Sequence, residues 1–172
     1  MDRFRRQAVG DGAMAVVTAY EHSRGASVVD VSLGRDPRLS AELEKLGVES
    51  PRVPSADLVS ASNGHVRLIE VKGRGSSGPI KVMERELYTF QAAGDSSWLY
   101  VVWNVTQTAP YRLVLVQDPQ RLSWENIRPA RKPVDSPRGV GEEGQFQCEA
   151  AEITELGVEV DLAGVALPEK AR

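Results

Sequence analysis

Two acidic residues and a lysine fall on either side of a predicted tight turn. Asp57 opens a run of strand-forming residues, and Glu70 and Lys72 stand near the end of the next run. Carboxylates are ligands that Mg²⁺ and Mn²⁺ prefer, and such a cation polarises a phosphate and lowers the pKa of a bound water. A lysine beside them can orient that water or stabilise negative charge in the transition state. The three side chains together predict metal-dependent cleavage of nucleic-acid phosphodiesters.

A β-hairpin is predicted to bring these side chains together. Two strand-like runs, residues 56–62 and 65–71, flank the dipeptide Asn63-Gly64, which is typical of two-residue hairpin turns. With that turn, Asp57 lies directly opposite Glu70, and the lysine two residues after Glu70 points to the same face because strand side chains alternate. Two opposed carboxylates repel each other unless a cation lies between them.

The same residues are also compatible with a purely structural role. A Glu-x-Lys triplet is common on exposed strand faces, where Lys72 would simply pair with Glu70. Asp57 also suits a turn or the entry to a strand, and a shift of one residue in the hairpin register would turn its side chain to the opposite face. The apolar neighbours of Glu70 and the glycine-rich loop that follows the second strand favour a partly buried site.

Basic residues follow the candidate site. We expect Arg74, Lys81 and Arg85 to contact phosphates and position a nucleic acid without reading its sequence, with a solvated basic face as the alternative. The net charge of the chain is -3, but residues 64–138 hold eleven Lys and Arg against seven Asp and Glu, a local charge of +4. Residues 139–172 hold two against eight, a local charge of -6. Such a division suits a domain that meets an anionic partner through one surface.

The composition excludes several other classes of protein. Cys148 is the only cysteine, so an internal disulfide framework and a zinc site of several thiolates are excluded. His22 and His65 are the only histidines, so a multi-histidine metal centre is hard to assemble. No run approaches the roughly 18 apolar residues that cross a bilayer, and no signal-peptide stretch follows the basic N-terminus. With 41% hydrophobic and 26% charged residues, we expect a soluble, cytoplasmic protein with no membrane partner.

Helix-like and strand-like segments alternate around the hairpin. Periodicity predicts helices over residues 5–23, 39–46 and 84–93, and strands over residues 26–33, 56–62, 65–71, 98–105 and 111–117. This order predicts an α/β fold, a mixed central sheet flanked by helices, within residues 1–120. A linker or mobile loop is expected over residues 121–144. An acidic tail over residues 145–172 is expected to hold short strands at 145–148 and 158–162, as a small β-containing appendage.

The sequence at the candidate site resembles the PD-(D/E)xK nuclease superfamily, in which an Asp opens one strand and Glu-x-Lys lies on the next. The stretches ADLVSA, HVRLIEVKGR and IKVMERELYTFQAAGDSSWLYVVWNV are more specifically similar to the nuclease-like domain at the C-terminus of NO VEIN-type proteins. That domain also recurs beside helicases in bacterial phage-defence and restriction systems. The resemblance covers roughly residues 7–118 and implies a restriction-endonuclease-like core.

The resemblance also implies roles for individual residues. Asp57 and Glu70 correspond to metal ligands for Mg²⁺ or Mn²⁺, and Lys72 to the catalytic lysine. Glu86 falls close to where related Mrr-like nucleases place a polar residue near the substrate, and it completes the expected catalytic set.

The first predicted helix departs from the family pattern. The family often has an acid there, in the arrangement G-x-x-x-E, where this chain has Gly10 and Met14. Glu21 lies two turns further along the same face and would serve only if the helix were shifted. Reduced or lost activity is therefore one expectation.

Three functions are compatible with these residues. The first is a Mg²⁺- or Mn²⁺-dependent endonuclease that hydrolyses DNA in a phage-defence or restriction system, with a helicase or another defence subunit as partner. The second is a catalytically inactive nuclease-like module that binds nucleic acid or a partner protein, which Met14 and the net charge favour. The third is an interaction domain whose acidic tail docks to a larger subunit. DNA or RNA as substrate, a stand-alone or excised domain, and monomer or homodimer all stay open.

Overall fold

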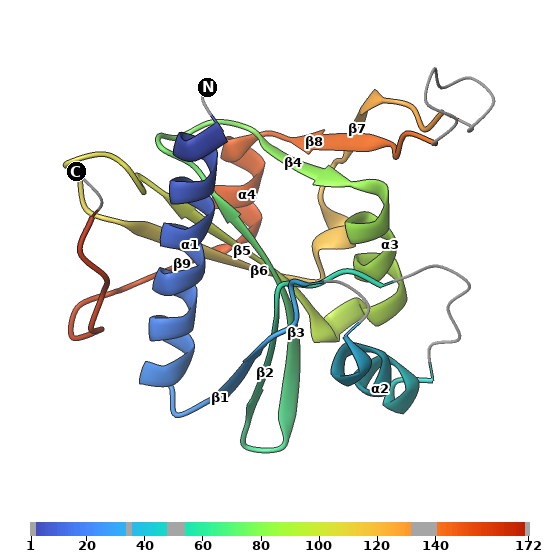
Figure 1. Ribbon diagram of the computed structural model, residues 1–172, viewed down its shortest axis with the longest axis horizontal. Helices are drawn as coiled ribbons and strands as arrows, with labels where there is room; N and C mark the ends of the chain where they lie inside the picture. Colours follow the sequence, from blue (N-terminus) through green and yellow to red (C-terminus); the bar gives the residue numbers. More distant parts are fainter. Residues whose placement is uncertain (1–2, 34–35, 48–53, 132–140, 171–172) are drawn as a thin grey trace.

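The computed structural model describes residues 3–33, 36–47, 54–131 and 141–170. The helices are α1 (Arg3–Ser23), α2 (Pro37–Lys45), α3 (Glu84–Ala93) and α4 (Ala150–Leu156), with short 3-10 turns η1 (Gly94–Ser96) and η2 (Pro119–Arg121). The strands are β1 (Ser27–Asp30), β2 (Leu58–Ser62), β3 (His65–Gly73), β4 (Ile80–Met83), β5 (Ser97–Trp103), β6 (Arg112–Gln117), β7 (Glu125–Arg128), β8 (Gln145–Cys148) and β9 (Val158–Val160). Figure 1 shows their arrangement.

A six-stranded mixed sheet forms the centre of the molecule. Its strand order is β1-β2-β3-β5-β6-β9, and the pair β3 and β5 is parallel whereas the other pairs are antiparallel. The parallel pair is joined by a crossover that contains β4 and α3, as a parallel connection requires. The predicted α/β fold with a mixed central sheet flanked by helices is therefore confirmed.

The hairpin has the register that its turn predicts. Ser62 pairs with His65 and Leu58 with Ile69. Asn63 and Gly64 have φ of 51° and 77°, which matches the pair of positive φ angles that a type I′ turn requires. The alternative of a one-residue register shift is excluded by these pairs.

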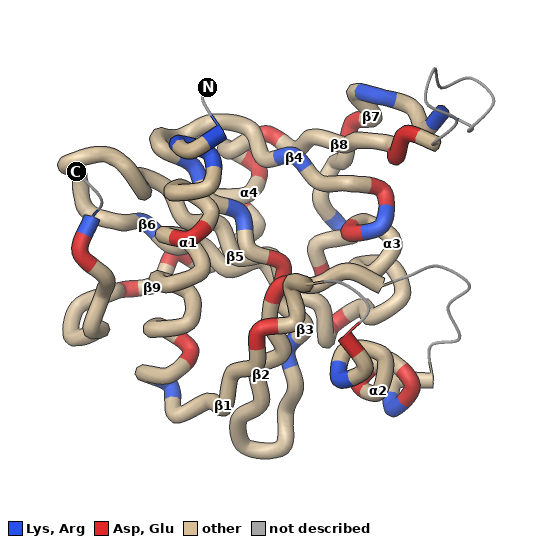
Figure 2. The backbone as a smooth tube through the Cα atoms, viewed as in Figure 1, with Lys and Arg blue, Asp and Glu red and all other residues tan. Residues whose placement is uncertain are grey.

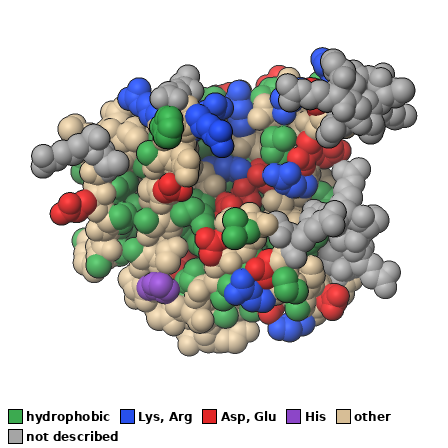
Figure 3. All heavy atoms as spheres, viewed as in Figure 1, with side chains coloured by type: hydrophobic (Ala, Val, Ile, Leu, Met, Phe, Trp, Pro, Cys, Tyr) green, Lys and Arg blue, Asp and Glu red, His purple; other side chains and the backbone are tan. Residues whose placement is uncertain are grey.

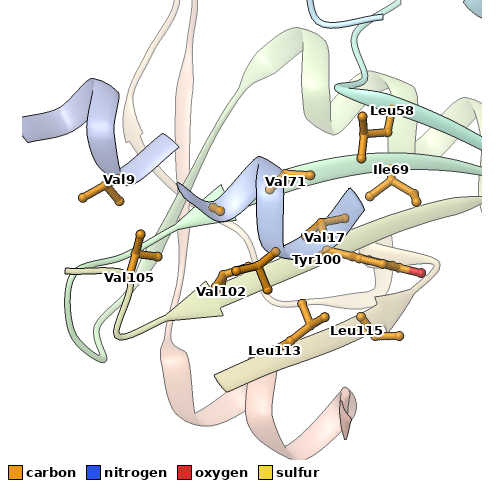
Figure 4. Close-up of a cluster of buried hydrophobic side chains, with 12 residues drawn as sticks. Val9, Val17, Leu58, Ile69, Val71, Tyr100, Val102, Val105, Leu113 and Leu115 are labelled. Carbon is orange, nitrogen blue, oxygen red and sulfur yellow. The ribbon is translucent and has the colours of Figure 1, made fainter. Parts of the chain in front are cut away.

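Helices cover both faces of the central sheet. On one face, α1 buries a cluster of aliphatic side chains with Tyr100 against β3, β5 and β6 (Figure 4). On the other face, α3 and α4 both pack against β5 and β6, in a second cluster that includes Phe90 and Ile153. Helix α2 packs nearby through Leu39 and Leu43. No helix of the described residues has the length and apolar character to cross a membrane.

The C-terminal part is more closely joined to the core than expected. A second sheet of order β4-β8-β7 has β4 from the core and β7 from the expected linker, residues 121–144. Strand β9, from the expected tail, pairs with β6 at the edge of the central sheet. The expected strands at 145–148 and 158–162 are present as β8 and β9, and the unexpected helix α4 lies between them. Residues 132–140 of the expected linker lie outside the described residues.

Candidate active site

The acidic and basic residues singled out in the hairpin converge at one end of β2 and β3. Asp57 directly precedes β2, and Glu70 and Lys72 lie on β3. Ile69 and Val71 pack in the cluster under α1, so the alternating Glu70 and Lys72 face the side that α3 covers. This is the placement that the PD-(D/E)xK resemblance implied.

Helix α3 supplies the fourth side chain. The Nζ atom of Lys72 lies 2.6 Å from Oε1 of Glu70 and 2.8 Å from Oε2 of Glu86. The Glu70 and Glu86 side chains are 4% and 8% exposed and that of Lys72 is 19% exposed, so a nearly buried ammonium bridges two buried carboxylates. Glu86 also accepts a hydrogen bond of 2.9 Å from the backbone N–H of Met83, which fixes its position relative to the start of α3.

The position of Asp57 is fixed by the backbone of its neighbours. Its Oδ2 atom accepts a 2.8 Å hydrogen bond from the N–H of Val71, and its own N–H donates to the carbonyl of Ile69. Two residues earlier, the N–H of Ser55 donates to Oγ1 of Thr89 on α3. Helix α3 therefore holds both Glu86 and the segment that leads into Asp57.

Burial and crowding of like charges disfavour the ionised carboxylates. Burial is the largest effect on Glu70, and with the charges of Glu86 and Asp57 it raises the pKa of that carboxyl well above its ordinary value, although Lys72 acts in the opposite direction. Burial likewise raises the pKa of Asp57, against the hydrogen bond from Val71 and the charge of Lys72. Among the described residues, these three carboxylates share the site with one lysine, so their fully ionised forms would carry more negative charge than that lysine compensates.

Lys72 is held in its charged form. Burial alone would lower its pKa, but the adjacent Glu70 and Glu86 carboxylates outweigh burial and raise the pKa of Lys72 above its ordinary value. The ammonium therefore persists at neutral pH.

The donor set fits a hard divalent cation. Asp57 and Glu70 supply carboxylate oxygens, and Mg²⁺ is typically held by one or two carboxylates with water and substrate phosphate. Each of these carboxylates has one oxygen engaged by the described residues, Oδ2 of Asp57 by Val71 and Oε1 of Glu70 by Lys72. Within the described ranges, however, no group of three or more His, Cys, Asp and Glu side chains is close enough together to hold a metal ion. A cation here would depend on water and substrate for its remaining ligands.

The three basic residues expected to bind nucleic acid lie in different settings. Lys81 is exposed on β4. The guanidinium of Arg74 lies against Gly78, where an added Cβ would be 2.7 Å from its Nη2 atom. Arg85 donates from its backbone N–H and its guanidinium to Glu143, at 2.7 and 3.1 Å. Figure 2 shows basic positions at the start of α1 and on β4 along the upper side of the view, above acidic positions near β3 and α3.

Glu21 does not join this site. Its side chain is fully buried and accepts hydrogen bonds from Ser60 and Tyr100, both at 2.6 Å, and from Arg24 at 2.7 and 2.9 Å. Tyr100 belongs to the cluster under α1, so Glu21 lies on the opposite face of the sheet from Glu70. As α1 is placed in this structure, Glu21 therefore does not take the place of the missing helix acid. Met14 also packs against the cluster under α1.

Two contributors to the site were not anticipated from the sequence. The charge of Asp30, on the neighbouring strand β1, adds to the effects that raise the pKa of Asp57. Glu143 binds the first turn of α3 from a distant part of the chain. No local pattern marks either residue, because both act through contacts between segments far apart in sequence.

Residues 11–116 match the family model described as "Protein NO VEIN, C-terminal". The chain belongs to the NO VEIN C-terminal family. The match covers more than half of the chain and confirms the resemblance stated from the sequence, and residues 117–172 lie beyond it.

The chain is also similar to a solved structure of low sequence identity. The solved structure of Hjc, a Holliday junction resolvase from Archaeoglobus fulgidus, is 19% identical and covers 77% of this chain and 93% of its own, with a TM-score of 0.35. No curated protein matches the sequence.

Proposed function

We propose that this NO VEIN C-terminal domain is a metal-dependent endonuclease that hydrolyses DNA, with Asp57 and Glu70 as metal ligands and Lys72 as the catalytic lysine. The observation that carries this proposal is the imbalance of charge at the end of the hairpin. Three carboxylates, those of Asp57, Glu70 and Glu86, act on one another there, and in the part of the chain that the structure describes they share one ammonium, that of Lys72.

That imbalance separates a binding site from a structural ion pair. A buried ion pair that serves stability is balanced in charge and satisfied in hydrogen bonds, because an uncompensated buried charge costs several kcal/mol, about 3–5 on removal of one partner. Here burial raises the pKa of both Asp57 and Glu70, and the charge of Glu86 adds to that effect in each case. A divalent cation would reverse the sign of that repulsion, so this site is suited to a cationic ligand.

The protonation state of Lys72 defines what it can do. Since its pKa is raised, it does not accept a proton from water at neutral pH. It can instead donate hydrogen bonds to the attacking water or to a phosphate oxygen and offset the charge that develops there. Glu86 would keep the ammonium in place through the 2.8 Å contact, which makes Glu86 a positioning residue for Lys72 in this proposal.

Hydrolysis forms a bond from the oxygen of water to phosphorus while the bond to the leaving oxygen breaks and that oxygen gains a proton. A bound Mg²⁺ or Mn²⁺ supplies Lewis acidity at the phosphate and lowers the pKa of a coordinated water. Asp57 and Glu70 would hold the cation on the same face as Lys72. In this proposal Asp57 and Glu70 bind the cation, and Lys72 stabilises the negative charge that develops on the phosphate.

The surface around the site suits a polyanion. In the space-filling view, acidic side chains adjoin basic ones over the region between α1 and α3 (Figure 3). Arg5 and Arg6 in the first turns of α1 and Lys81 on β4 are exposed, and within the described ranges no carboxylate forms an ion pair with any of them. Cations at a helix N-terminus oppose the helix dipole, so their presence in α1 favours contact with phosphates.

The test is cleavage of supercoiled plasmid with Mg²⁺ or Mn²⁺, comparing the wild type with Glu70→Ala and Lys72→Ala. Glu42→Ala, which removes an exposed ion pair with Lys45 on α2, is the matched control. We expect the wild type and the control to nick or linearise the plasmid and both site variants to be inactive. Cleavage that survives both site substitutions would assign the activity to a different site or to a contaminant.

A catalytically silent module is the second candidate. It is favoured by the closed cluster of Lys72 with Glu70 and Glu86 and by Met14 at the position of the family's helix acid. Thermal unfolding distinguishes the two: a ligand at 100 times its Kd stabilises the folded state by about 2.7 kcal/mol, so millimolar Mg²⁺ or Mn²⁺ should raise the Tm of the wild type but not that of Asp57→Asn. A flat response without cleavage, with DNA binding retained at low salt, would establish the silent module.

The biological setting stays a prediction from the family resemblance. A role in phage defence or restriction and a helicase as partner each rest on that resemblance, whereas a homodimeric state follows from the proposed cleavage of both DNA strands.

A further inference from the structure

Helix α3, which carries Glu86, has a methionine at its N-cap position in place of a polar capping residue. The first backbone N–H groups of a helix have no partner within it and are normally satisfied by a Ser, Thr, Asp or Asn side chain at the N-cap. The N-cap of α3 is Met83, with φ of -88° and ψ of 158°, and its thioether makes no capping hydrogen bond. Glu86 accepts from the N–H of Met83, which leaves the amides of Glu84 and Arg85 to other acceptors. The acceptors come instead from the two residues that precede β8.

Two residues just before β8 occupy the place of the missing cap. The N–H of Glu84 donates to the carbonyl of Gly144 at 2.9 Å. The N–H of Arg85 donates to Oε1 of Glu143 at 2.7 Å, and the Arg85 guanidinium donates to Oε2 of the same carboxylate at 3.1 Å. A carboxylate at a helix N-terminus also interacts favourably with the helix dipole. Both ends of the Glu143 carboxylate are thus committed to the first turn of α3.

Strand pairing extends the same contact along the chain. β8 pairs with β4, and Gln145 lies opposite Met83, the last residue before α3. The turn from Met83 to Glu86 is therefore held on one side by the β8 segment. On the other side it reaches the site, because Oε2 of Glu86 accepts from the N–H of Met83 and from Nζ of Lys72.

We propose that Glu143 is a positioning residue for the candidate active site, holding the first turn of α3 so that Glu86 keeps Lys72 in place. This inference rests on the proposed function for its catalytic consequence. Glu143 lies beyond residue 116, where the match to the family model ends, so this chain completes the site with a segment outside the matched region. The Arg85–Glu143 pair is itself partly exposed, at 54% and 25% for the two side chains, and contributes little to global stability.

Amide hydrogen exchange, measured by NMR on the full chain, tests this without any need for activity. Glu143→Ala should speed exchange at the Arg85 amide by at least about tenfold, the factor expected for loss of a hydrogen bond to a charged group. It should also speed exchange at the Met83 amide, which is bonded to Glu86 rather than to Glu143. Glu143→Gln retains an acceptor oxygen and should restore most of the protection.

Glu142→Ala is the matched control, since Glu142 is the adjacent carboxylate and contacts Arg131 at 3.9 Å rather than α3. If Glu143→Ala speeds exchange at the Arg85 amide alone, and exchange at the Met83 amide is the same as in Glu142→Ala, the contact is only a local cap and the positioning role is refuted.

Kinetics then test the catalytic consequence. In a chain that cleaves DNA, Glu143→Ala should lower kcat about tenfold with KM within about twofold, at a temperature where circular dichroism shows it folded. A rate equal to that of Glu142→Ala would overturn the proposal while leaving the nuclease assignment intact. If the wild type does not cleave at all, the proposed function fails and the exchange of Met83 alone decides the structural coupling.

Discussion

The buried network around Glu21 gives the sharpest test of the fold that carries the site. Glu21 is fully buried between α1 and the sheet. Its two oxygens accept hydrogen bonds from Arg24, Ser60 and Tyr100, and Arg67 lies 3.4 Å away. Burial is the main effect that raises the pKa of Tyr100, and the charge of Glu21 adds to it. The tyrosine therefore remains a neutral donor to the carboxylate.

Replacing Glu21 with alanine removes the acceptor that all of these donors share. Breaking a buried charge network by removing one partner costs about 3–5 kcal/mol, against a total stability of about 5–15 kcal/mol for a typical domain. For a chain of 172 residues, each kcal/mol corresponds to about 2–4 °C in Tm. We therefore expect Glu21→Ala to lower the Tm by roughly 6–20 °C. Glu21→Gln keeps one acceptor oxygen but loses the charge, and it should fall between the wild type and alanine.

Urea and thermal unfolding followed by circular dichroism measure this effect. The matched control is Glu159→Ala, because Glu159 binds the Arg112 guanidinium at 2.7 and 2.9 Å but is 45% exposed. An exposed pair of this kind is worth about 0–1 kcal/mol. If Glu21→Ala lost no more stability than Glu159→Ala, the network would not be a major source of stability, and the apolar contacts of α1 alone would have to hold the helix on the sheet.

Two further predictions concern the packing of Gly73 at the end of β3 and the pH dependence that the buried carboxyls of Asp57 and Glu70 confer on stability. A Cβ added at Gly73 would lie 2.7 Å from the carbonyl oxygen of Val9, so Gly73→Ala should lower the free energy of unfolding by about 1–3 kcal/mol through overpacking. Gly10→Ala, which meets no atom within 4 Å, should instead stabilise α1 by up to about 1 kcal/mol in the same denaturation assay. Glu70 and Asp57 have raised pKa values in the folded state, so above a pH of about 4.5 the folded protein keeps protons that the unfolded chain has released. The contribution of these two carboxyls to stability therefore falls as the pH rises from about 4.5 through their folded-state pKa values. Glu70→Gln should therefore be more stable than the wild type at pH 8 without divalent cations, and it should lose that advantage at pH 4.5. If the Tm of the variant and that of the wild type changed with pH in the same way, the raised pKa of Glu70 would be contradicted.

The hairpin could be predicted from sequence because its information is local. Asn63 and Gly64 tolerate positive φ, and a two-residue turn fixes every cross-strand pair that follows from it. The juxtaposition of Asp57 and Glu70 needs no knowledge of the rest of the chain beyond that turn. The helix at 84–93 was predictable for the same reason, since its apolar spacing and the following Gly94 mark its extent.

Other parts depend on contacts that no local pattern records. Strand β7, Glu125–Arg128, has all four residues exposed, so it shows none of the alternation that identifies a strand, and its pairing with β8 is what orders it. Glu21 looks like any other helix acid until α1 is packed against β2 and β5. Glu143 likewise resembles its neighbour Glu142, and the fold alone decides which of the two reaches α3.

The two buried carboxylates on opposite faces of the sheet, Glu21 and Glu70, differ in how far neighbouring groups compensate their charge. At Glu21, one carboxylate meets two guanidinium groups and two hydroxyls, so its charge is compensated and removing it should destabilise the protein. At Glu70, several carboxylates share one ammonium among the described residues, so neutralising a carboxylate should stabilise the protein and a cation should do the same. Opposite signs of response to Glu→Gln at these two buried positions would therefore separate a residue retained for the fold from one retained for a ligand. Burial and residue type, which the two positions share, cannot make that distinction, whereas the balance of charge around each carboxylate can.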